Sequence, residues 1–325
     1  MLSYWMQTVS NESVLELRET ARPTPGPDQV LVQLHAASLN RGEFVIGHGL
    51  HKSGVANAIG MEGAGVVVEL GTNAKGIKVG DKVMGRCRAA FAEYACMDVR
   101  EAMQIPASIS FEQASSIPLT FLVVHDMLSI QGKLKADEWL LINGVSSGVG
   151  VAALQTAKAM GAKVIGTSGS PEKLKRLEQF GLDVPICSRG PGFASQIMEL
   201  TDGVGVNLVV NTVGGTVFAE DIRCMAFEAR LAMVGYVDGV LHADLDLQAL
   251  HAKRLKLFGV SNKLRTADQR AEFLPEFKAE VLPAIADGRI KPLVDQVFPF
   301  DQLSQAKAMM ESNQHVGKIV LRMPV

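Results

Sequence analysis

The sequence has few cysteines that could form disulfide bonds and no long apolar run that could span a membrane. It holds only four cysteines, and they are scattered without a CxxC pair: Cys87, Cys96, Cys187 and Cys224. Such cysteines are typical of free thiols in a reducing compartment and argue against a disulfide framework or a zinc knuckle. No apolar run approaches the roughly 18 residues that a membrane helix needs. The N-terminus lacks the basic and then apolar pattern of a secretory signal, so we expect a cytoplasmic protein.

A strong charge of one sign is also missing. The chain carries 32 basic and 34 acidic side chains, mixed along its length, for a net charge of −2. This balance argues against a nucleic-acid surface and against a patch for acidic lipids. Apolar residues make up 47% and charged residues 20%, the profile of a folded globular protein. A chain of 325 residues exceeds one ordinary core, so two domains are expected.

The first third of the chain has the residue pattern of β-strands. Short strands are predicted at residues 30–34, 63–71 and 79–84, with frequent glycine and proline between them. Short strands with such turns favour a small barrel, which we assign to residues 1–120.

The middle of the chain, residues 121–263, alternates strands with helices. Nearly all-apolar strands are predicted at 139–142, 163–167, 208–210, 231–234 and 255–260, and helices at 151–160 and from Pro171. Apolar strands that alternate with helices indicate a parallel sheet covered on both faces. The remainder predicts helices at 273–287 and 298–313 and a strand at 317–321. Because that tail is too short for its own core, we expect residues 264–325 to complete the first domain.

A glycine-rich turn is the most informative stretch of the sequence. It follows the strand at 139–142 and opens the next helix, as Gly144-Val145-Ser146-Ser147-Gly148-Val149-Gly150. Small residues there let the backbone approach a pyrophosphate, and the helix N-terminus offers free N–H groups and a positive dipole. The sequence therefore predicts a dinucleotide site at Ser146, Ser147, Gly148, Val149 and Gly150.

The end of the next strand carries a second nucleotide signal. A site that prefers NAD places Asp or Glu there to hold the ribose 2′-hydroxyl. This chain has Ser168 and Gly169 instead, with Lys173 one helical turn later and Arg189 after the following strand. Hydroxyl, N–H and cationic groups accommodate a 2′-phosphate that a carboxylate would repel. We therefore predict NADPH as the cofactor.

Taken together, these motifs resemble the medium-chain dehydrogenase/reductase superfamily, in its zinc-independent quinone oxidoreductase branch. The resemblance covers nearly the whole chain and rests on Gly60-Met61-Glu62-Gly63-Ala64-Gly65-Val66-Val67, Val79-Gly80-Asp81-Lys82-Val83, the glycine turn, Val213-Gly214-Gly215 and Gly317-Lys318-Ile319-Val320-Leu321. It implies an α/β protein with a GroES-like β-barrel domain, a Rossmann doubly wound parallel sheet and the active cleft between them. It also implies a homodimer that pairs through the strand at 255–260.

The zinc ligands of other members of that superfamily are missing. Asn40 stands at the position of the first cysteine ligand and Met61 at that of the histidine, and the chain from Gly85 to Phe91 leaves no room for a four-cysteine lobe. Because a catalytic zinc needs about three N, O or S ligands, we predict no metal. Reduction without a Lewis acid favours quinones and α,β-unsaturated carbonyls, in which the negative charge spreads into a hydroquinone anion or an enolate.

Asn40 is the candidate catalytic residue, as a donor that orients the substrate carbonyl; the alternative is an asparagine that forms a turn. The family pattern Asn, Asp, Tyr becomes Asn40, Glu43 and Val45 here, so the tyrosine hydroxyl is missing. Val123 stands where the family implies a threonine, with Thr120 close by. Other candidates, each with an alternative role in the core or on the surface, are His48 and His51 as proton donors, Tyr236 and Asn262 as cofactor contacts, and Phe44, Phe91 and Tyr94 as an apolar wall.

Three functions remain open at this point. The first is an NADPH-dependent reductase of quinones or enones. The second is an enoyl-thioester reductase that acts on a CoA or carrier-protein substrate, whose phosphate Arg86 and Arg88 would meet. The third is a non-catalytic NADPH-binding protein on the same scaffold, since a fold does not fix a function.

Overall fold

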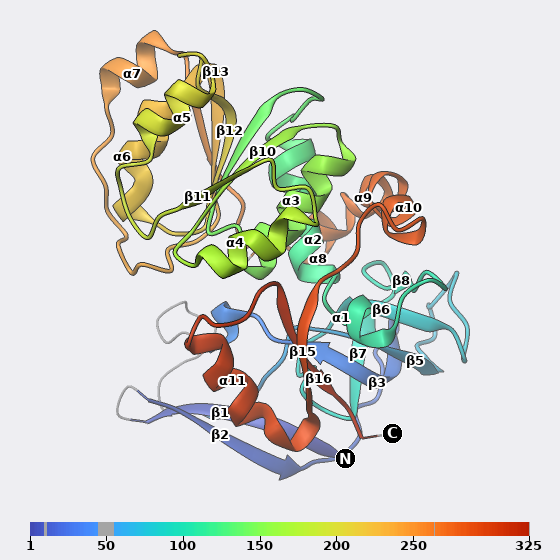
Figure 1. The fold of residues 1–325 in the computed structure, drawn as a ribbon. Coiled ribbons are helices and arrows are strands. Elements are labelled where there is room, and N and C mark those ends of the chain that lie inside the picture. Colours follow the sequence, from blue (N-terminus) through green and yellow to red (C-terminus); the bar gives the residue numbers. More distant parts are fainter. Residues whose placement is uncertain (10–11, 45–54, 263, 325) are drawn as a thin grey trace. The chain divides into compact units, whose positions relative to one another are not determined.

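The computed structural model describes residues 1–9, 12–44, 55–262 and 264–324. The chain divides into two compact units, the first formed by residues 1–119, 267–276 and 292–325 and the second by residues 120–266 and 277–291 (Figure 1). Residues 277–291, which the sequence assigned to the first domain, lie in the second unit. The Gln155 side chain holds this segment, because it donates to the Lys291 carbonyl (2.9 Å) and accepts from the Lys291 N–H (2.7 Å).

The first unit is built on two sheets. The smaller has the order β2-β1-β4, from β1 (Leu2–Val9), β2 (Glu12–Glu19) and β4 (Asn57–Ala58). The larger runs β15-β16-β3-β5-β6-β8, with β7 also paired to β3; its strands are β3 (Gln29–Ser38), β5 (Glu62–Leu70), β6 (Lys82–Arg86), β7 (Tyr94–Asp98), β8 (Met103–Gln104), β15 (Val294–Pro299) and β16 (Lys318–Arg322). Inward-facing aliphatic side chains of β3, β5 and β16 form its core.

The first unit also contains the helices α1 (Phe111–Ser115), α8 (Ala267–Ala271) and α11 (Leu303–Glu311) and 3-10 turns at Arg41–Glu43 and Phe300–Gln302. Along the chain, α2 (Pro118–His125) and α9 (Leu274–Glu280) cross from the first unit into the second, which holds α10 (Leu282–Ala286) and a π-helical turn at Asp126–Ile130.

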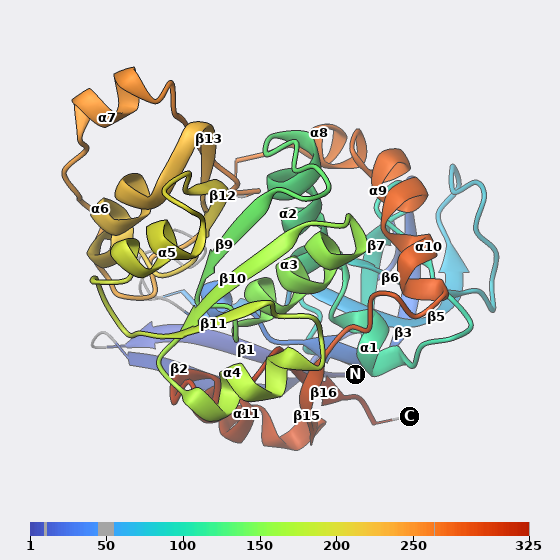
Figure 2. The same cartoon turned by 45° about the horizontal axis from the view of Figure 1, so that its top comes forward.

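The second unit contains one parallel sheet in the order β11-β10-β9-β12-β13-β14 (Figure 1, Figure 2). Its strands are β9 (Trp139–Asn143), β10 (Lys163–Ser168), β11 (Val184–Cys187), β12 (Val206–Asn211), β13 (Met225–Met233) and β14 (Lys256–Gly259), and its helices are α3 (Gly148–Ala159), α4 (Pro171–Glu178), α5 (Ala194–Leu200), α6 (Gly215–Cys224) and α7 (Leu247–Ala252). This is the strand order of a Rossmann fold, so the predicted doubly wound sheet is confirmed.

The carboxyl ends of these strands lie in register. Pairing places one residue of each strand on a line across the sheet: Ile186, Thr167, Asn143, Asn211, Met233 and Gly259. In open α/β sheets ligands bind outside this edge. The predicted cofactor residues 146–150, 168, 169, 173, 189, 236 and 262 all follow this line in their own strand–loop segments.

Three predicted elements differ from the structure. The helix predicted at 273–287 is interrupted between α9 and α10, where Pro283 stands in the first turn of α10. The helix predicted from residue 298 starts at Leu303, because Phe298 and Pro299 end strand β15. The strand predicted from residue 79 starts at Lys82, because Gly80 turns the chain with a positive φ of 91°.

Candidate functional site

The glycine-rich turn has the geometry of a helix N-terminus open to solvent. Ser147 is the N-cap of α3, and its hydroxyl accepts from the Gly150 N–H at 3.0 Å. Gly144 reverses the chain with a φ of +77° and accepts from the Ser147 N–H at 3.0 Å. Residues 146–149 are partly exposed whereas Gly150 is buried. The turn therefore presents its backbone at the start of a 12-residue helix, as an anion site requires.

A buried polar network beneath the turn holds three strand ends together. The Asp221 carboxylate accepts from Asn143 Nδ2 (2.5 Å) and from Asn211 Nδ2 (2.8 Å), and Thr167 Oγ1 donates to Asn143 Oδ1 (3.0 Å). Asn211 Oδ1 also accepts from the Val213 and Gly214 N–H groups, which fixes the loop after β12. Burial raises the pKa of the Asp221 carboxyl well above its usual range, against the two amide hydrogen bonds.

Sequence reasoning missed this network. Its signal was the polar residue at the end of each of two apolar strands, at positions 140–143 and 208–211 of the printed sequence. A buried polar side chain needs a partner, and the partner here lies 78 positions away from Asn143, on helix α6.

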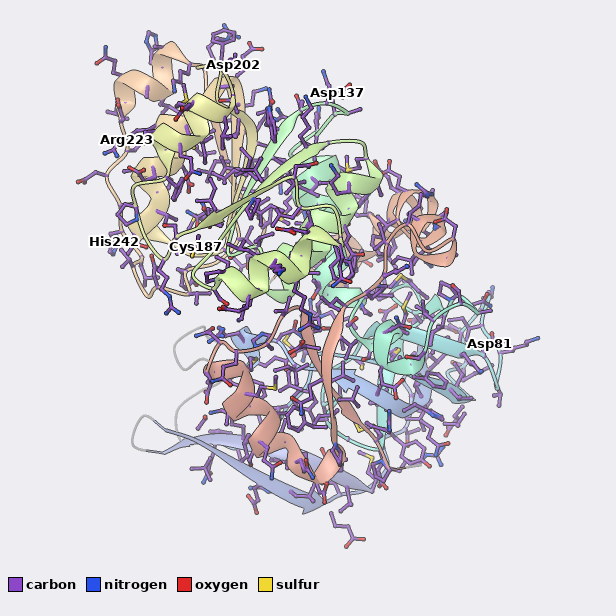
Figure 3. The ribbon with its side chains drawn as sticks, viewed as in Figure 1. Asp81, Asp137, Cys187, Asp202, Arg223 and His242 are labelled. Carbon is purple, nitrogen blue, oxygen red and sulfur yellow. The ribbon has the colours of Figure 1, made fainter. Side chains whose placement is uncertain are left out.

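The groups predicted to hold a 2′-phosphate lie at the ends of two neighbouring strands. Ser168 ends β10, and its hydroxyl oxygen lies 3.3 Å from that of Ser146 in the glycine turn. A Cβ on Gly169 would lie 2.2 Å from Cγ of Arg189, so the Arg189 side chain lies against this glycine. Its Nε donates to the Gly169 carbonyl at 3.3 Å. Cys187, labelled in Figure 3, is the last residue of β11 and marks this edge of the sheet.

The helix after β10 adds a second cation. Ser170 caps α4, and its hydroxyl accepts from the Lys173 N–H at 3.3 Å and donates to the Glu172 carboxylate at 2.7 Å. Lys173 thus belongs to the first turn of a capped helix that starts beside Ser168. Ser168 lies beside the glycine turn, Arg189 lies against Gly169, and Lys173 lies in the first turn of the helix that follows.

The other two predicted cofactor contacts follow the farther strands. Tyr236 lies in the loop after β13 and is exposed, whereas Asn262 follows β14 and accepts from Arg265 through its amide oxygen (3.2 Å). Both lie past the carboxyl edge of the sheet.

Within the first unit, Asn40 belongs to a cluster of charged side chains. Its Nδ2 donates to Glu62 Oε1 (2.9 Å) and to Glu43 Oε1 (3.1 Å), and its Oδ1 accepts from Lys318 Nζ (2.7 Å). Glu62 Oε1 also accepts from Lys318 Nζ (3.1 Å), and its Oε2 accepts from the Leu119 N–H (2.7 Å). Glu43, Glu62 and Lys318 are buried, whereas Asn40 is partly exposed.

Glu43 is the group of this cluster with the largest pKa change. Burial raises the pKa of its carboxyl to about 8, and the negative charge of Glu62 acts in the same direction. The hydrogen bond from Asn40 and the positive charge of Lys318 act against this rise. Glu43 therefore retains its proton at neutral pH.

This pKa predicts a pH-dependent stability. Below pH 4.5 Glu43 is protonated in both the folded and the unfolded chain; between pH 4.5 and 8 only the unfolded chain releases the proton. The free energy of unfolding should therefore fall as pH rises through this window, by up to about 1.4 kcal/mol per pH unit. Glu43→Gln should remove this slope, measured by denaturant unfolding at several pH values. Glu311→Gln, on an exposed position of α11, is the control; equal slopes in wild type and Glu43→Gln would contradict the assignment.

The remaining predicted residues fall into two groups. Phe44 and Phe91 stack with ring centroids 6.1 Å apart inside the core, and Tyr94 carries Arg22 over its ring (4.4 Å). Core packing thus accounts for the two phenylalanines. Thr120 is buried on α2. Val45, His48 and His51 lie outside the described residues.

Comparisons with known proteins match both units. The model of the alcohol dehydrogenase GroES-like domain matches residues 26–107, and that of zinc-binding dehydrogenases matches residues 148–277. The chain is similar to the Escherichia coli quinone oxidoreductase solved in complex with NADPH, at 28% identity and a TM-score of 0.88, over 99% of this chain and 100% of that one. It is also similar to the CurK enoyl reductase, at 26% identity and a TM-score of 0.84, over 98% of this chain and 99% of that one.

Curated relatives include a much larger protein. A phenolphthiocerol/phthiocerol polyketide synthase of Mycobacterium tuberculosis is 31% identical over 312 residues, which cover 95% of this chain. The chain spans only 14% of the length of that synthase. The match therefore concerns one segment of a multidomain protein.

Proposed function

Because the chain belongs to the medium-chain dehydrogenase/reductase superfamily, in its quinone oxidoreductase-like branch, we propose that it is an NADPH-dependent reductase of quinones or α,β-unsaturated carbonyl compounds. The observation that carries this function is the sheet edge of the second unit. There Ser146 of the glycine turn meets Ser168, and Arg189 meets Gly169. Ser168 and Gly169 stand where NAD-preferring relatives place a carboxylate.

NADPH fits the residues at this edge. The backbone at residues 146–150 would hold the pyrophosphate, and Ser168, Gly169, Lys173 and Arg189 would hold the 2′-phosphate. Tyr236 and Asn262 follow the farther strands and would meet the nicotinamide half. Bound NADPH supplies the hydride, so the chain itself needs only to orient the acceptor and to stabilise the charge that develops on it.

We propose further that no zinc ion takes part in the reaction, although the family model that matches residues 148–277 is that of zinc-binding dehydrogenases. Both carboxylate oxygens of Glu62 already accept hydrogen bonds, and the Lys318 ammonium lies 3.1 Å from one of them. A divalent cation placed there would be repelled by this ammonium. Met61, with only a thioether, is a poor zinc ligand. The donor set therefore does not fit a catalytic zinc.

The chemistry of the acceptor follows from this arrangement. An enone takes hydride at its β carbon and a quinone at one of its carbonyl oxygens. The negative charge then collects on the conjugated oxygen, and a proton completes the reduction. Asn40 is the partly exposed member of the buried cluster and can donate to such an oxygen. Its Nδ2 donates to Glu43 (3.1 Å) and to Glu62 (2.9 Å), so one of these two bonds would give way to the substrate oxygen.

Asn40→Ala is expected to lower turnover by about 100-fold, the effect of removing one donor to a developing oxyanion. NADPH affinity should stay close to that of wild type, because every residue assigned to the cofactor lies in the second unit. Steady-state kinetics and a binding titration measure the two quantities. Asn73→Ala, at an exposed position of the same unit, is the control. Unchanged turnover in Asn40→Ala would make Asn40 a structural residue only.

A second candidate function has direct support from the comparisons. The CurK enoyl reductase and the polyketide synthase relatives suggest reduction of an enoyl thioester. Arg88 is exposed and Arg86 is partly exposed. These two arginines would bind the phosphate of CoA or of a carrier-protein arm.

One substrate panel separates these functions. NADPH oxidation is followed with 9,10-phenanthrenequinone, trans-3-penten-2-one and crotonyl-CoA. We expect turnover with the quinone or the enone. Turnover with crotonyl-CoA alone would establish the thioester reductase instead. Tight NADPH binding without turnover of any acceptor would indicate the third possibility, a non-catalytic NADPH-binding protein.

We propose a homodimer that pairs through β14. This strand is the last in the order of its sheet and pairs on one side with β13. Leu257 on it is exposed, with Phe258 partly exposed. A strand edge with apolar side chains is a template for a second copy. Leu257→Asp should shift the sedimentation coefficient from that of a dimer to that of a monomer; a monomeric wild type would refute the pairing.

For localisation, we propose the cytoplasm. All four cysteines are free, and Cys187 is exposed, which suits a reducing compartment. Among the described residues, none of the helices has the length and apolar character to cross a membrane.

A further inference from the structure

Lys318 is a buried ammonium at the centre of the Asn40 cluster. It begins β16, which pairs antiparallel with β3, and the Leu39 N–H donates to the Ile319 carbonyl beside it (3.0 Å). Its Nζ donates to the Leu39 carbonyl (3.0 Å), to Asn40 Oδ1 (2.7 Å) and to Glu62 Oε1 (3.1 Å). Its three N–H donors are thus matched by three acceptors, as a buried lysine requires.

The position of Lys318 decides which way the Asn40 amide points. In the observed orientation Oδ1 faces the ammonium and Nδ2 faces the carboxyl groups of Glu43 and Glu62. A flipped amide would place its NH2 group against the ammonium and its oxygen against the two carboxyl groups. The contact with the ammonium would then join two donors, and the contact with the Glu62 carboxylate would join two acceptors. Without the ammonium, the contact that holds Oδ1 in the observed orientation is lost, and only the carboxyl groups beside Nδ2 still favour it.

We propose that Lys318 is a positioning residue that orients and polarises the Asn40 amide for the substrate carbonyl. This inference rests on the proposed function, because it assigns Asn40 to the substrate. An ammonium bonded to the amide oxygen withdraws electron density from the nitrogen, and its hydrogens become stronger donors. Lys318 thereby provides a fixed positive charge in the Asn40 cluster, and it acts on the substrate only through Asn40.

The test removes both charges of the buried pair together. Lys318→Met alone leaves the Glu62 carboxylate without its counter-ion, so the double variant Lys318→Met/Glu62→Gln is compared with wild type and with Glu62→Gln, which keeps the lysine. The effect of Lys318 is the change beyond that of Glu62→Gln. We expect the double variant to fold, to keep the wild-type Kd for NADPH and to lose at least about tenfold in kcat on the accepted quinone or enone. The matched control is Lys307→Met/Glu311→Gln, an ion pair on α11 of the same unit (2.7 Å), which should leave kcat unchanged. A folded Lys318→Met/Glu62→Gln protein with wild-type kcat would overturn the proposal.

A second measurement does not depend on turnover. With selective 15N-asparagine labelling, the side-chain amide of Asn40 is assigned by the signal that disappears in Asn40→Ala. In wild type we expect two slowly exchanging amide hydrogens; in Lys318→Met/Glu62→Gln both should shift and exchange faster, whereas in the control pair they should not. Unchanged signals in the double variant would overturn the orienting role. If wild type reduces no acceptor, the proposed function fails while this measurement still decides whether Lys318 orients Asn40.

Discussion

Gly150→Ala is expected to abolish tight NADPH binding and to destabilise the second unit. An alanine Cβ at this position would lie 2.5 Å from the Gly144 carbonyl oxygen and 2.7 Å from the Val145 backbone. Gly to Ala inside a helix normally stabilises by up to about 1 kcal/mol, but overpacking of this kind costs about 1–3 kcal/mol. The clash is with backbone atoms, so the start of α3 must move away from the turn after β9.

The loss of affinity follows from the same displacement. Hydrogen bonds from backbone N–H groups to a charged phosphate contribute about 1.5–3 kcal/mol each, so losing two weakens binding by at least about 100-fold. NADPH titration by fluorescence and a thermal melt measure the two effects.

Gly190→Ala is the matched control for this substitution. An added Cβ there would meet nothing within 4 Å, and Gly190 lies in the loop after β11 of the same unit. It should leave melting temperature and affinity close to those of wild type. If Gly150→Ala binds NADPH with wild-type affinity, the pyrophosphate does not bind at this turn.

The second large effect is expected on cofactor selectivity. Lys173→Ala/Arg189→Ala removes the two cations predicted to meet the 2′-phosphate, and each charge-assisted contact is worth about 1.5–3 kcal/mol. NADPH affinity should therefore fall by at least about 100-fold, whereas NADH affinity should change little because NADH lacks this phosphate.

Lys175→Ala is the control for the selectivity prediction, because Lys175 is an exposed cation on the same helix α4. It should change the affinity for neither nucleotide. If the double variant loses as much affinity for NADH as for NADPH, Lys173 and Arg189 do not bind the 2′-phosphate.

The two groups of candidate residues, one in each unit, differ in how much of them the sequence predicted. The nucleotide group depends on local signals: a strand, a turn of small residues and a helix follow one another directly, and each has its own pattern. The absence of an acid at Ser168 and Gly169 is also visible in the printed sequence. These features place the residues predicted to bind the cofactor at one sheet edge as soon as the strands pair in parallel.

The Asn40 cluster of the first unit shows the opposite. The sequence indicated Asn40 as a donor but gave no sign that both hydrogens of its amide are directed at carboxyl groups. In the sequence Lys318 stands only in the closing strand, and no pattern assigns it a role. Its partners Asn40 and Glu62 lie 278 and 256 positions earlier in the chain. No periodicity links residues so far apart.

By itself, then, the sequence determined the alternation of strands and helices, the glycine turn and the balance of charge beside it, because each of these depends on neighbours along the chain. Only the tertiary structure decided which buried polar groups meet. The pairing of β16 with β3 brings the Lys318 ammonium to Asn40, and the packing of α6 brings Asp221 to Asn143 and Asn211. The physical reason is that a buried charge must find its partner in space, wherever the fold supplies one.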